Sequence, residues 1–312
     1  MNKLKILFVT RNDRQYTVPA SYYFIQELSM LTDLYVSHRS GDINEIVASL
    51  EEKPDFIYIN DYFENGSPII KGLKDVKIPF AVGLHDLHYQ KPYRKAMLEK
   101  EEVKHIFTYY RDKFLKWYPE FSAQMHWLPH HAQTDLYYDY QLDKNIDLLM
   151  TGSLLEDYYP LRVLMQKRLA KRPEFTYLPH PGYRHIKEQE KNTYVGARYA
   201  KELNRAKISL TCDSVFKYPL MKYFEITACN TLLLAPYSKE LGDLGFVPGV
   251  HFVSIDEQNF EEKAYYYLEH EEERQTIAQN GMRLSQKRHS TKQRAKDFLK
   301  EVETILANSS ST

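Results

Sequence analysis

Residues 146–153 read IDLLMTGS, an apolar strand (Ile146–Thr151) that runs directly into a glycine and a serine. A helix with apolar spacing follows at Leu161–Ala170, and then a second strand at Phe175–Leu178. The preceding residues 137–145, YYDYQLDKN, are polar and show no apolar periodicity, so we interpret them as a linker. A strand–helix–strand order that restarts after a linker indicates a second α/β unit.

Strands and helices alternate on both sides of this linker. Upstream, the predicted strands are Lys5–Thr10, Asp33–Ser37, Phe56–Asn60, Pro79–Leu84, His105–Tyr109 and Met125–Leu128, and the predicted helices are Ser21–Leu31, Ile43–Glu51, Pro68–Leu73 and Lys91–Lys100. Downstream, strands at Ile208–Cys212, Thr231–Ala235 and His251–Ile255 alternate with helices at Val195–Ala206, Lys222–Ala228, Asn259–His270, Glu271–His289 and Thr291–Ala307. This order predicts βαβ units and parallel sheets covered on both faces.

We therefore predict an α/β fold of two Rossmann-like, doubly wound parallel-sheet domains that face each other across a cleft. The predicted domains are residues 1–138 and 139–290. A C-terminal helix at 291–312 either packs back on the N-terminal domain or supports a homodimer. Ligands of such sheets bind at the carboxyl ends of the strands, so the predicted site lies in the cleft.

Composition narrows the function class. The 42 basic and 42 acidic residues balance, which argues against a nucleic-acid binder with its basic surface. The two cysteines, Cys212 and Cys229, provide neither a disulfide framework nor metal-ligand spacing, and both are expected to be buried thiols. No stretch reaches the ~20 apolar residues of a membrane span. A cytoplasmic protein is the expectation.

The first candidate site is the turn Thr151-Gly152-Ser153 between a strand and a helix. Glycine lets the backbone approach a ligand, and N–H groups ahead of a helix favour an anion. Arg162, in the following helix, either reaches toward a phosphate or solvates the helix face. A plain tight turn is the alternative.

The second candidate lies in KYPLMKYFEITACNT, residues 217–231. The carboxylate of Glu225 can accept hydrogen bonds from two adjacent hydroxyls, as holding a ribose requires. Lys222 is three residues earlier on the same helical face and either pairs with Glu225 or faces a diphosphate. A solvent-exposed Glu–Lys pair is the alternative. Tyr218 belongs to the same stretch and is a further candidate for nucleotide binding.

Histidines form the third group. His85 and Asp86 follow a strand of the N-terminal half, where either could act as general base on an acceptor hydroxyl. No third cluster of ligands supports a metal there. His180 follows a strand of the C-terminal half, where the base of a nucleotide could pack. Polar loops with structural hydrogen bonds are the alternative for both.

Several of these segments resemble one family, the spore-maturation CgeB-like glycosyltransferases of the GT-B superfamily. The segments similar to its C-terminal half are Leu154–Arg162, Leu203–Leu210 and Tyr223–Leu234, with His126–Gln133 similar to its pre-linker loop and Glu271–His289 to its closing helices. The likeness covers roughly Met125 to Leu299.

The resemblance implies a donor site on the C-terminal domain and sugar transfer without an obligatory metal. It implies that Glu225 binds ribose, that Gly152 and Ser153 face phosphate, and that Lys222 is the accompanying basic residue. Three positions depart from the family pattern: Lys217 replaces an acid, Asn230 replaces a turn glycine but tolerates a left-handed backbone, and Gln133 replaces an acid.

The predicted function is a hexosyltransferase-like enzyme of glycan biosynthesis. It would move a sugar from a nucleotide-diphosphate sugar, with UDP-sugars favoured, to a glycan, protein or small-molecule hydroxyl. The alternatives are an inactive nucleotide or nucleotide-sugar binding protein, for which Lys217 is the main support, a nucleotide-sugar epimerase, and a nucleotide-independent scaffold.

Overall fold

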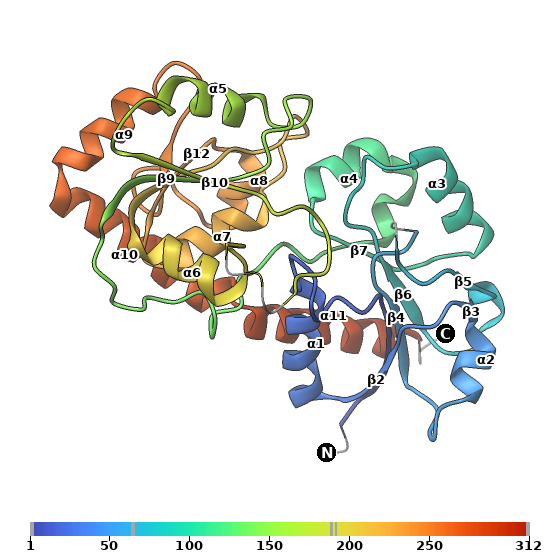
Figure 1. Cartoon of the computed structure of the whole chain (residues 1–312). Coiled ribbons are helices and arrows are strands. Elements are labelled where there is room, and N and C mark those ends of the chain that lie inside the picture. The colour runs from blue at the N-terminus through green and yellow to red at the C-terminus, as the bar shows by residue number, and fades with distance from the viewer. Residues whose placement is uncertain (1–2, 64–65, 188–189, 191, 310–312) are drawn as a thin grey trace. The chain divides into compact units, whose positions relative to one another are not determined.

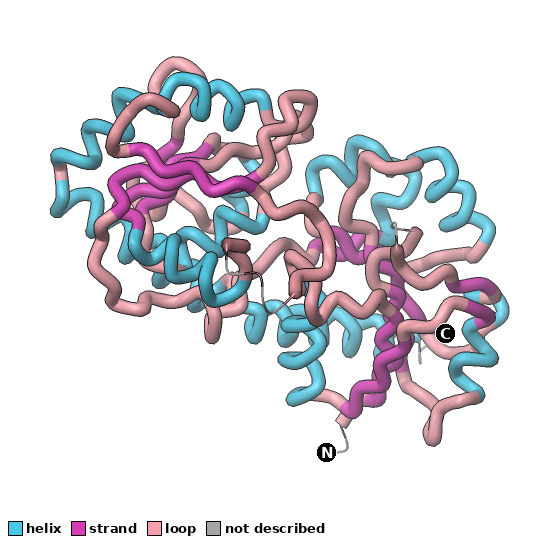
Figure 2. Tube along the Cα trace, viewed as in Figure 1, coloured by secondary structure: helices cyan, strands magenta, loops and turns pink. Residues whose placement is uncertain are grey.

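The computed structural model describes residues 3–63, 66–187, 190 and 192–309 of the chain. Within these residues the chain forms two compact units (Figure 1). The N-terminal unit contains residues 3–14, 20–129 and 294–309, and the C-terminal unit contains residues 15–19 and 130–293. Figure 2 shows strands gathered into a layer within each unit, with helices around them. The predicted limits at residues 1 and 312 lie outside the described residues.

The N-terminal unit is built on a six-stranded sheet in the order β2-β1-β4-β6-β7-β8, with every pair parallel. The strands are β1 (Lys5–Val9), β2 (Asp33–Ser37), β4 (Phe56–Ile59), β6 (Phe80–Gly83), β7 (Ile106–Thr108) and β8 (Met125–Trp127). The helices are α1 (Ala20–Leu31), α2 (Ile43–Ala48), α3 (Lys91–Lys100) and α4 (Arg111–Trp117). The inner strands β1, β4, β6 and β7 are short, mostly buried apolar runs, as expected for a parallel sheet that is covered on both faces.

The C-terminal helix α11 (Thr291–Ser309) completes the core of the N-terminal unit. Phe298 is fully buried, and its ring centroid lies 4.9 Å from that of Tyr58 and 5.0 Å from that of Phe107. Ala295, Val302 and Ile305 belong to the same buried cluster. The apolar face of this helix is therefore used inside the chain's own core.

The C-terminal unit has a five-stranded parallel sheet in the order β10-β9-β11-β12-β13. The strands are β9 (Ile146–Gly152), β10 (Phe175–Pro179), β11 (Ala206–Leu210), β12 (Leu232–Ala235) and β13 (Val253–Ser254). The helices are α5 (Pro160–Leu169), α6 (Gly196–Arg205), α7 (Met221–Ala228), α8 (Lys239–Asp243), α9 (Phe260–Glu269) and α10 (Glu271–Arg288). Figure 1 shows α5 and α9 on one face of this sheet and α6, α7 and α10 on the other.

The strand order reverses beside β9, because the chain runs from β9 to β10 on one side and then to β11 on the other. Such a switch point opens a crevice at the carboxyl ends of the two central strands. Gly152 and Leu210 end these two strands. The turn predicted from IDLLMTGS therefore lies where a doubly wound sheet binds its ligand.

The predicted α/β class and parallel sheets are confirmed, but one predicted helix is wrong. Within Pro68–Leu73, residues Ile70–Lys71 form the short strand β5, which pairs with β3 (Gly41–Asp42). Gly72 then takes a left-handed conformation (φ 76°), which a continuing helix does not allow. Helices α4 and α8 were missed, since seven and five residues are too few to show a clear apolar period.

The segment between the two sheets belongs to the C-terminal unit from His130 onward, whereas the sequence prediction kept residues up to 138 in the N-terminal domain. Ala132 exchanges backbone hydrogen bonds with His289 and Thr291, each 2.9 Å long. The amide of Asn204 donates to the carbonyl of Tyr138, 2.8 Å away, so the predicted linker is fixed by the helix α6. None of the helices in the described ranges is long and apolar enough to cross a membrane.

Candidate functional site

Two cations flank the turn at the end of β9. Gly152 has φ 121°, and a Cβ at this position would lie 3.0 Å from Nη1 of Arg162 and 3.3 Å from Cε of Lys222. Glycine is therefore required both by the backbone conformation and by the space that the two side chains occupy. The turn, Arg162 and Lys222 form one cluster, although the sequence separates them by up to seventy residues.

Lys222 is held on the turn by two oxygens. Its Nζ donates to Thr151 Oγ1 at 3.1 Å and to the Tyr199 hydroxyl at 3.2 Å, and it lies 4.8 Å from the centroid of the Tyr199 ring. Burial lowers the pKa of Lys222 to about 8; Glu225 raises it, and Arg162 lowers it further. The ammonium group is thus charged at neutral pH and loses its proton in the mildly alkaline range.

Arg162 lies in the first turn of α5 and is almost fully buried, with 2% of its surface exposed. Its Nη1 donates to the carbonyl of Ser153 at 2.9 Å, and its guanidinium stacks 4.1 Å from the centroid of Tyr159. The side chain therefore points back over the glycine turn and does not solvate the helix face. Tyr177 also holds this turn, because its hydroxyl donates to the Gly152 carbonyl at 2.7 Å.

Glu225 lies in the second turn of α7 and is only 7% exposed. Burial raises its pKa, while Lys222 and a hydrogen bond with the Tyr137 side chain lower it. The sequence left open that Glu225 and Lys222 form a solvent-exposed pair, but the Glu225 side chain is buried. It is a buried carboxyl group that interacts electrostatically with Lys222, on the helix that follows β11.

The chain reverses sharply before α7. Lys217 adopts a left-handed conformation (φ 60°), and its N–H donates to the carbonyl of Ser214 at 2.8 Å. This conformation costs a residue with a side chain of the order of 1 kcal/mol. The Lys217 ammonium lies 3.5 Å from the buried carboxylate of Asp213. Asn230, at the other end of α7, is left-handed as expected (φ 54°).

The two remaining C-terminal candidates lie in loops. His180 follows β10, and its Nδ1 accepts a hydrogen bond from the Gly182 N–H at 3.0 Å. Burial, Lys222 and Arg162 lower the pKa of His180 to about 4, which places this ring within electrostatic range of both cations. Tyr218 is buried in the loop before α7, with its ring 5.4 Å from that of Phe216.

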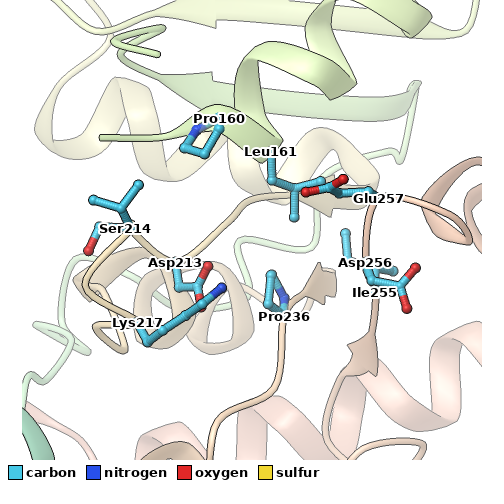
Figure 3. Close-up of a pocket in the computed structure, with 10 residues that line it drawn as sticks. Pro160, Leu161, Asp213, Ser214, Lys217, Pro236, Ile255, Asp256 and Glu257 are labelled. Atoms are coloured by element: carbon cyan, nitrogen blue, oxygen red, sulfur yellow. The ribbon is translucent and has the colours of Figure 1, made fainter. Parts of the chain in front are cut away.

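The C-terminal unit also contains a cavity of about 330 Å³, within the range of small-molecule sites (Figure 3). Its lining residues come from the start of α5 and from the loops after β11, β12 and β13: Pro160, Leu161, Asp213, Ser214, Val215, Lys217, Pro236, Ile255, Asp256 and Glu257. Leu161 and Asp213 line the cavity, while their chain neighbours Arg162 and Cys212 interact electrostatically with Lys222. The cavity is thus lined by residues next in sequence to two members of the cluster's electrostatic environment.

In the N-terminal unit, His85 and Asp86 have different environments. His85 is 7% exposed, and its Nε2 lies 2.9 Å from Asn60 Oδ1 and 3.3 Å from Asp61 Oδ1. Asp86 is exposed, and its backbone carbonyl accepts a hydrogen bond from the buried Arg94. The sequence interpretation missed Asn60 and Asp61, although a polar pair directly after the apolar strand β4 was a usable signal.

Among the residues that the structure describes, no group of three or more His, Cys, Asp or Glu side chains is placed to hold a metal ion. The charges that converge on the Gly152 turn are instead side-chain cations. Arg162 and Lys222 both face a glycine at a strand end, which is an arrangement suited to an anionic ligand.

Comparison with solved structures identifies this architecture. HepE from Anabaena, crystallised with UDP-glucose, is 12% identical and superposes with a TM-score of 0.68, covering 96% of this chain and 100% of HepE. The fold is GT-B. A glycosyltransferase from Rickettsia africae superposes at 10% identity with a TM-score of 0.63, covering 99% of this chain and 100% of the other.

A third GT-B structure, sucrose-phosphate synthase from Thermosynechococcus elongatus, matches at 13% identity and a TM-score of 0.61, covering 85% of this chain and 76% of the synthase. Residues 162–300 match the model of a family described as glycosyl transferase-like. No curated protein sequence matches the chain. The matched segment begins at Arg162 and contains Lys222 and Glu225, so it includes most of the candidate residues of the C-terminal unit.

Proposed function

We propose that this protein is a glycosyltransferase that takes its sugar from a nucleotide-diphosphate donor bound by the C-terminal unit. The observation that carries the proposal is the convergence of Arg162 and Lys222 on the Gly152 turn, with the buried Glu225 on the same helix as Lys222. The glycosyl transferase-like family match over residues 162–300 and the GT-B fold support it.

Each residue of the C-terminal cluster has a role in this proposal. Arg162 and Lys222, with the backbone of Gly152 and Ser153, neutralise the diphosphate. Glu225 accepts hydrogen bonds from the ribose hydroxyls, as a carboxylate with two oxygens can. His180 and Tyr218 pack against the nucleoside. In this proposal the 330 Å³ cavity lined by the start of α5 receives the sugar ring.

The chemistry follows from the charges. As the bond between the sugar and the diphosphate breaks, negative charge grows on the leaving oxygen, and the two cations stabilise it without an obligatory metal. We propose a UDP-sugar as donor, because HepE was crystallised with UDP and with UDP-glucose. The acceptor supplies a hydroxyl, with His85 or Asp86 as its base. Membership of the CgeB-like subfamily and action in the cytoplasm are part of the same proposal.

A second candidate is a protein that binds a nucleotide sugar without transferring the sugar. Lys217 favours this second candidate, because the resemblance leads us to expect an acidic residue at this position. The structure pairs the Lys217 ammonium with Asp213. Release of UDP from UDP-glucose separates the two candidates, because a binding protein holds the nucleotide sugar intact.

The test of the donor site is calorimetric titration of UDP into the wild type and into Glu225→Gln, which keeps the shape of the side chain and its bond to Tyr137. A hydrogen bond to a charged group contributes about 1.5–3 kcal/mol, so the loss of the carboxylate should weaken UDP binding by roughly 10- to 100-fold. The matched control is Glu272→Ala, at an exposed position in α10, which should leave the affinity unchanged. Equal UDP affinity in the wild type and Glu225→Gln would contradict the assignment of the ribose site.

A further inference from the structure

A short segment from the beginning of the sequence belongs to the C-terminal unit. Residues Gln15–Pro19 cluster with that unit, and they pair with the loop at residues 180–186, which follows β10. Tyr16 and His185 form an antiparallel β-bridge, and their rings meet edge to face with centroids 5.6 Å apart. The segment therefore lies against this loop as a short additional strand would.

Two backbone hydrogen bonds flank the bridge. The N–H of Thr17 donates to the carbonyl of Arg184 at 3.0 Å, and the N–H of Ile186 donates to the carbonyl of Gln15 at 2.8 Å. These bonds have the alternating pattern of an antiparallel ladder, in which each partner fixes the path of the other. The loop after β10 is thus held by backbone pairing with a segment that lies more than 160 positions away in the sequence.

The side chain of Thr17 adds a second set of contacts to this pairing. Thr17 is 7% exposed, and its hydroxyl donates to the carbonyl of Gly182 at 2.5 Å. The same oxygen accepts a hydrogen bond from the N–H of Arg184 at 3.2 Å. Gly182 and Arg184 are the two neighbours of Tyr183, so one hydroxyl holds the backbone on both sides of this tyrosine.

The loop carries two rings toward the donor site. Tyr183 is 70% exposed, and the centroid of its ring lies 4.7 Å from that of His180. His180 in turn interacts electrostatically with Lys222 and Arg162, the two cations of the proposed diphosphate site. Because most of the surface of Tyr183 is accessible, its ring is able to pack against a ligand bound by these cations.

A nucleoside base is the part of the proposed donor that suits these two rings. Bases are flat and aromatic, and stacking one on an aromatic side chain raises affinity by roughly 5- to 150-fold. Nδ1 of His180 accepts the N–H of Gly182, and the pKa of the ring is lowered by burial to about 4. The neutral ring then carries its hydrogen on Nε2, where it is able to donate to a carbonyl oxygen such as those of uracil.

We propose that Thr17 is a positioning residue of the donor site and that Tyr183, which its hydroxyl holds in place, packs against the base of the nucleotide. This inference rests on the proposed function, and it adds to the donor site a residue outside the segment 162–300 that matches the family model. Thr17 acts through the loop and does not touch the diphosphate. Its loss therefore weakens the binding of a nucleotide but not the binding of pyrophosphate, which has no base.

The test is calorimetric titration of UDP, and separately of inorganic pyrophosphate, into the wild type, Thr17→Val and Thr17→Ser. Valine removes the hydroxyl that Gly182 and Arg184 share, whereas serine keeps it. We expect UDP to bind about tenfold more weakly to Thr17→Val, pyrophosphate to bind within about twofold of the wild type, and Thr17→Ser to retain both affinities. The matched control is Thr304→Val, at an exposed position in α11, which should change neither affinity.

Two results of this titration would overturn the inference. Unchanged UDP affinity in Thr17→Val would show that the hydroxyl does not position the loop for the nucleotide. An equal loss of UDP and pyrophosphate affinity would show that Thr17 supports only the fold of the unit.

A double substitution tests whether Thr17 acts through Tyr183. Tyr183→Ala should weaken UDP binding by at least about fivefold, because the stacking surface is removed. Adding Thr17→Val to Tyr183→Ala should cause little further loss, since two residues that act as one unit give non-additive effects. Losses that simply add would contradict the coupling between the two residues.

Amide hydrogen exchange of the ligand-free protein tests the loop without any nucleotide. The N–H of Arg184 should exchange slowly in the wild type and in Thr17→Ser, and at least about tenfold faster in Thr17→Val, where its acceptor is gone. Equal exchange in the wild type and Thr17→Val would overturn the inference. A wild type that binds neither UDP nor pyrophosphate would refute the proposed function instead, while the exchange rate still decides whether Thr17 holds the loop.

Discussion

The depressed pKa of Lys222 predicts a pH dependence with two opposite consequences. The ammonium group, with a pKa of about 8 in the folded protein, loses its proton as the pH rises through 8. If Lys222 binds the diphosphate, UDP affinity falls over this range. A charge-assisted hydrogen bond contributes about 1.5–3 kcal/mol, so the total loss is roughly 10- to 100-fold. Bound phosphate favours the ammonium and raises its pKa in the complex, so the affinity falls from about pH 8 until the pH passes that raised pKa.

The stability of the ligand-free protein changes in the other direction. The folded pKa of Lys222 is lower than the ordinary value of 10.5, so the folded state carries the cost of a desolvated charge below pH 8. That cost disappears as the pH rises from 8 toward 10.5, and this residue's contribution to the free energy of unfolding increases. At 1.36 kcal/mol for each pKa unit, the change is about 3 kcal/mol.

Calorimetric titration of UDP between pH 7 and 9.5 measures the change in affinity, and thermal melts over the same range measure the change in stability. Lys222→Arg is the matched control, because arginine stays charged over this range. The wild type should lose UDP affinity as the pH rises, and Lys222→Arg should not. A wild-type affinity that is flat to pH 9.5, or an equal slope in both proteins, would refute the placement of Lys222 on the phosphate.

Three further substitutions test the turn, the core and a close helix contact. Gly152→Ala places a side chain at φ 121° against Arg162 and Lys222, so it should weaken UDP binding at least tenfold in a titration, and unchanged affinity would exclude the turn from the site. Phe298→Ala should lower the free energy of unfolding in urea by about 3–5 kcal/mol, because the ring fills the N-terminal core; a loss below 1 kcal/mol would contradict this packing. Gly281→Ala in α10 clashes with the carbonyl of His251 and should lower the melting temperature by several degrees, whereas an unchanged melt would show that this helix can shift.

The sequence predicted those parts of the molecule that depend on local patterns. The continuous apolar strands and the glycine after IDLLMT indicated two parallel sheets and a turn at the carboxyl end of β9. Asn230 was expected to keep a left-handed turn, and it does (φ 54°). These features depend on neighbouring residues only, so a linear pattern contains them.

The parts that could not be predicted depend on contacts across long stretches of sequence. Tyr199, Tyr177 and Tyr137 hold Lys222, the Gly152 turn and Glu225, yet each comes from a different helix, strand or loop. The 26 tyrosines of the chain give no local sign of which ones do this. The N-terminal unit ends before the predicted residue 138 because Ala132 pairs with His289 and Thr291, which lie more than 150 positions away in the sequence.

The position of the nucleotide is the central claim, and a crystal structure of the protein with UDP bound tests it most directly. We expect the diphosphate beside Gly152, within hydrogen-bonding distance of Lys222 Nζ and the Arg162 guanidinium, and the ribose hydroxyls on Glu225. UDP bound away from this turn, with Glu225 still closed against Tyr137, would contradict the account.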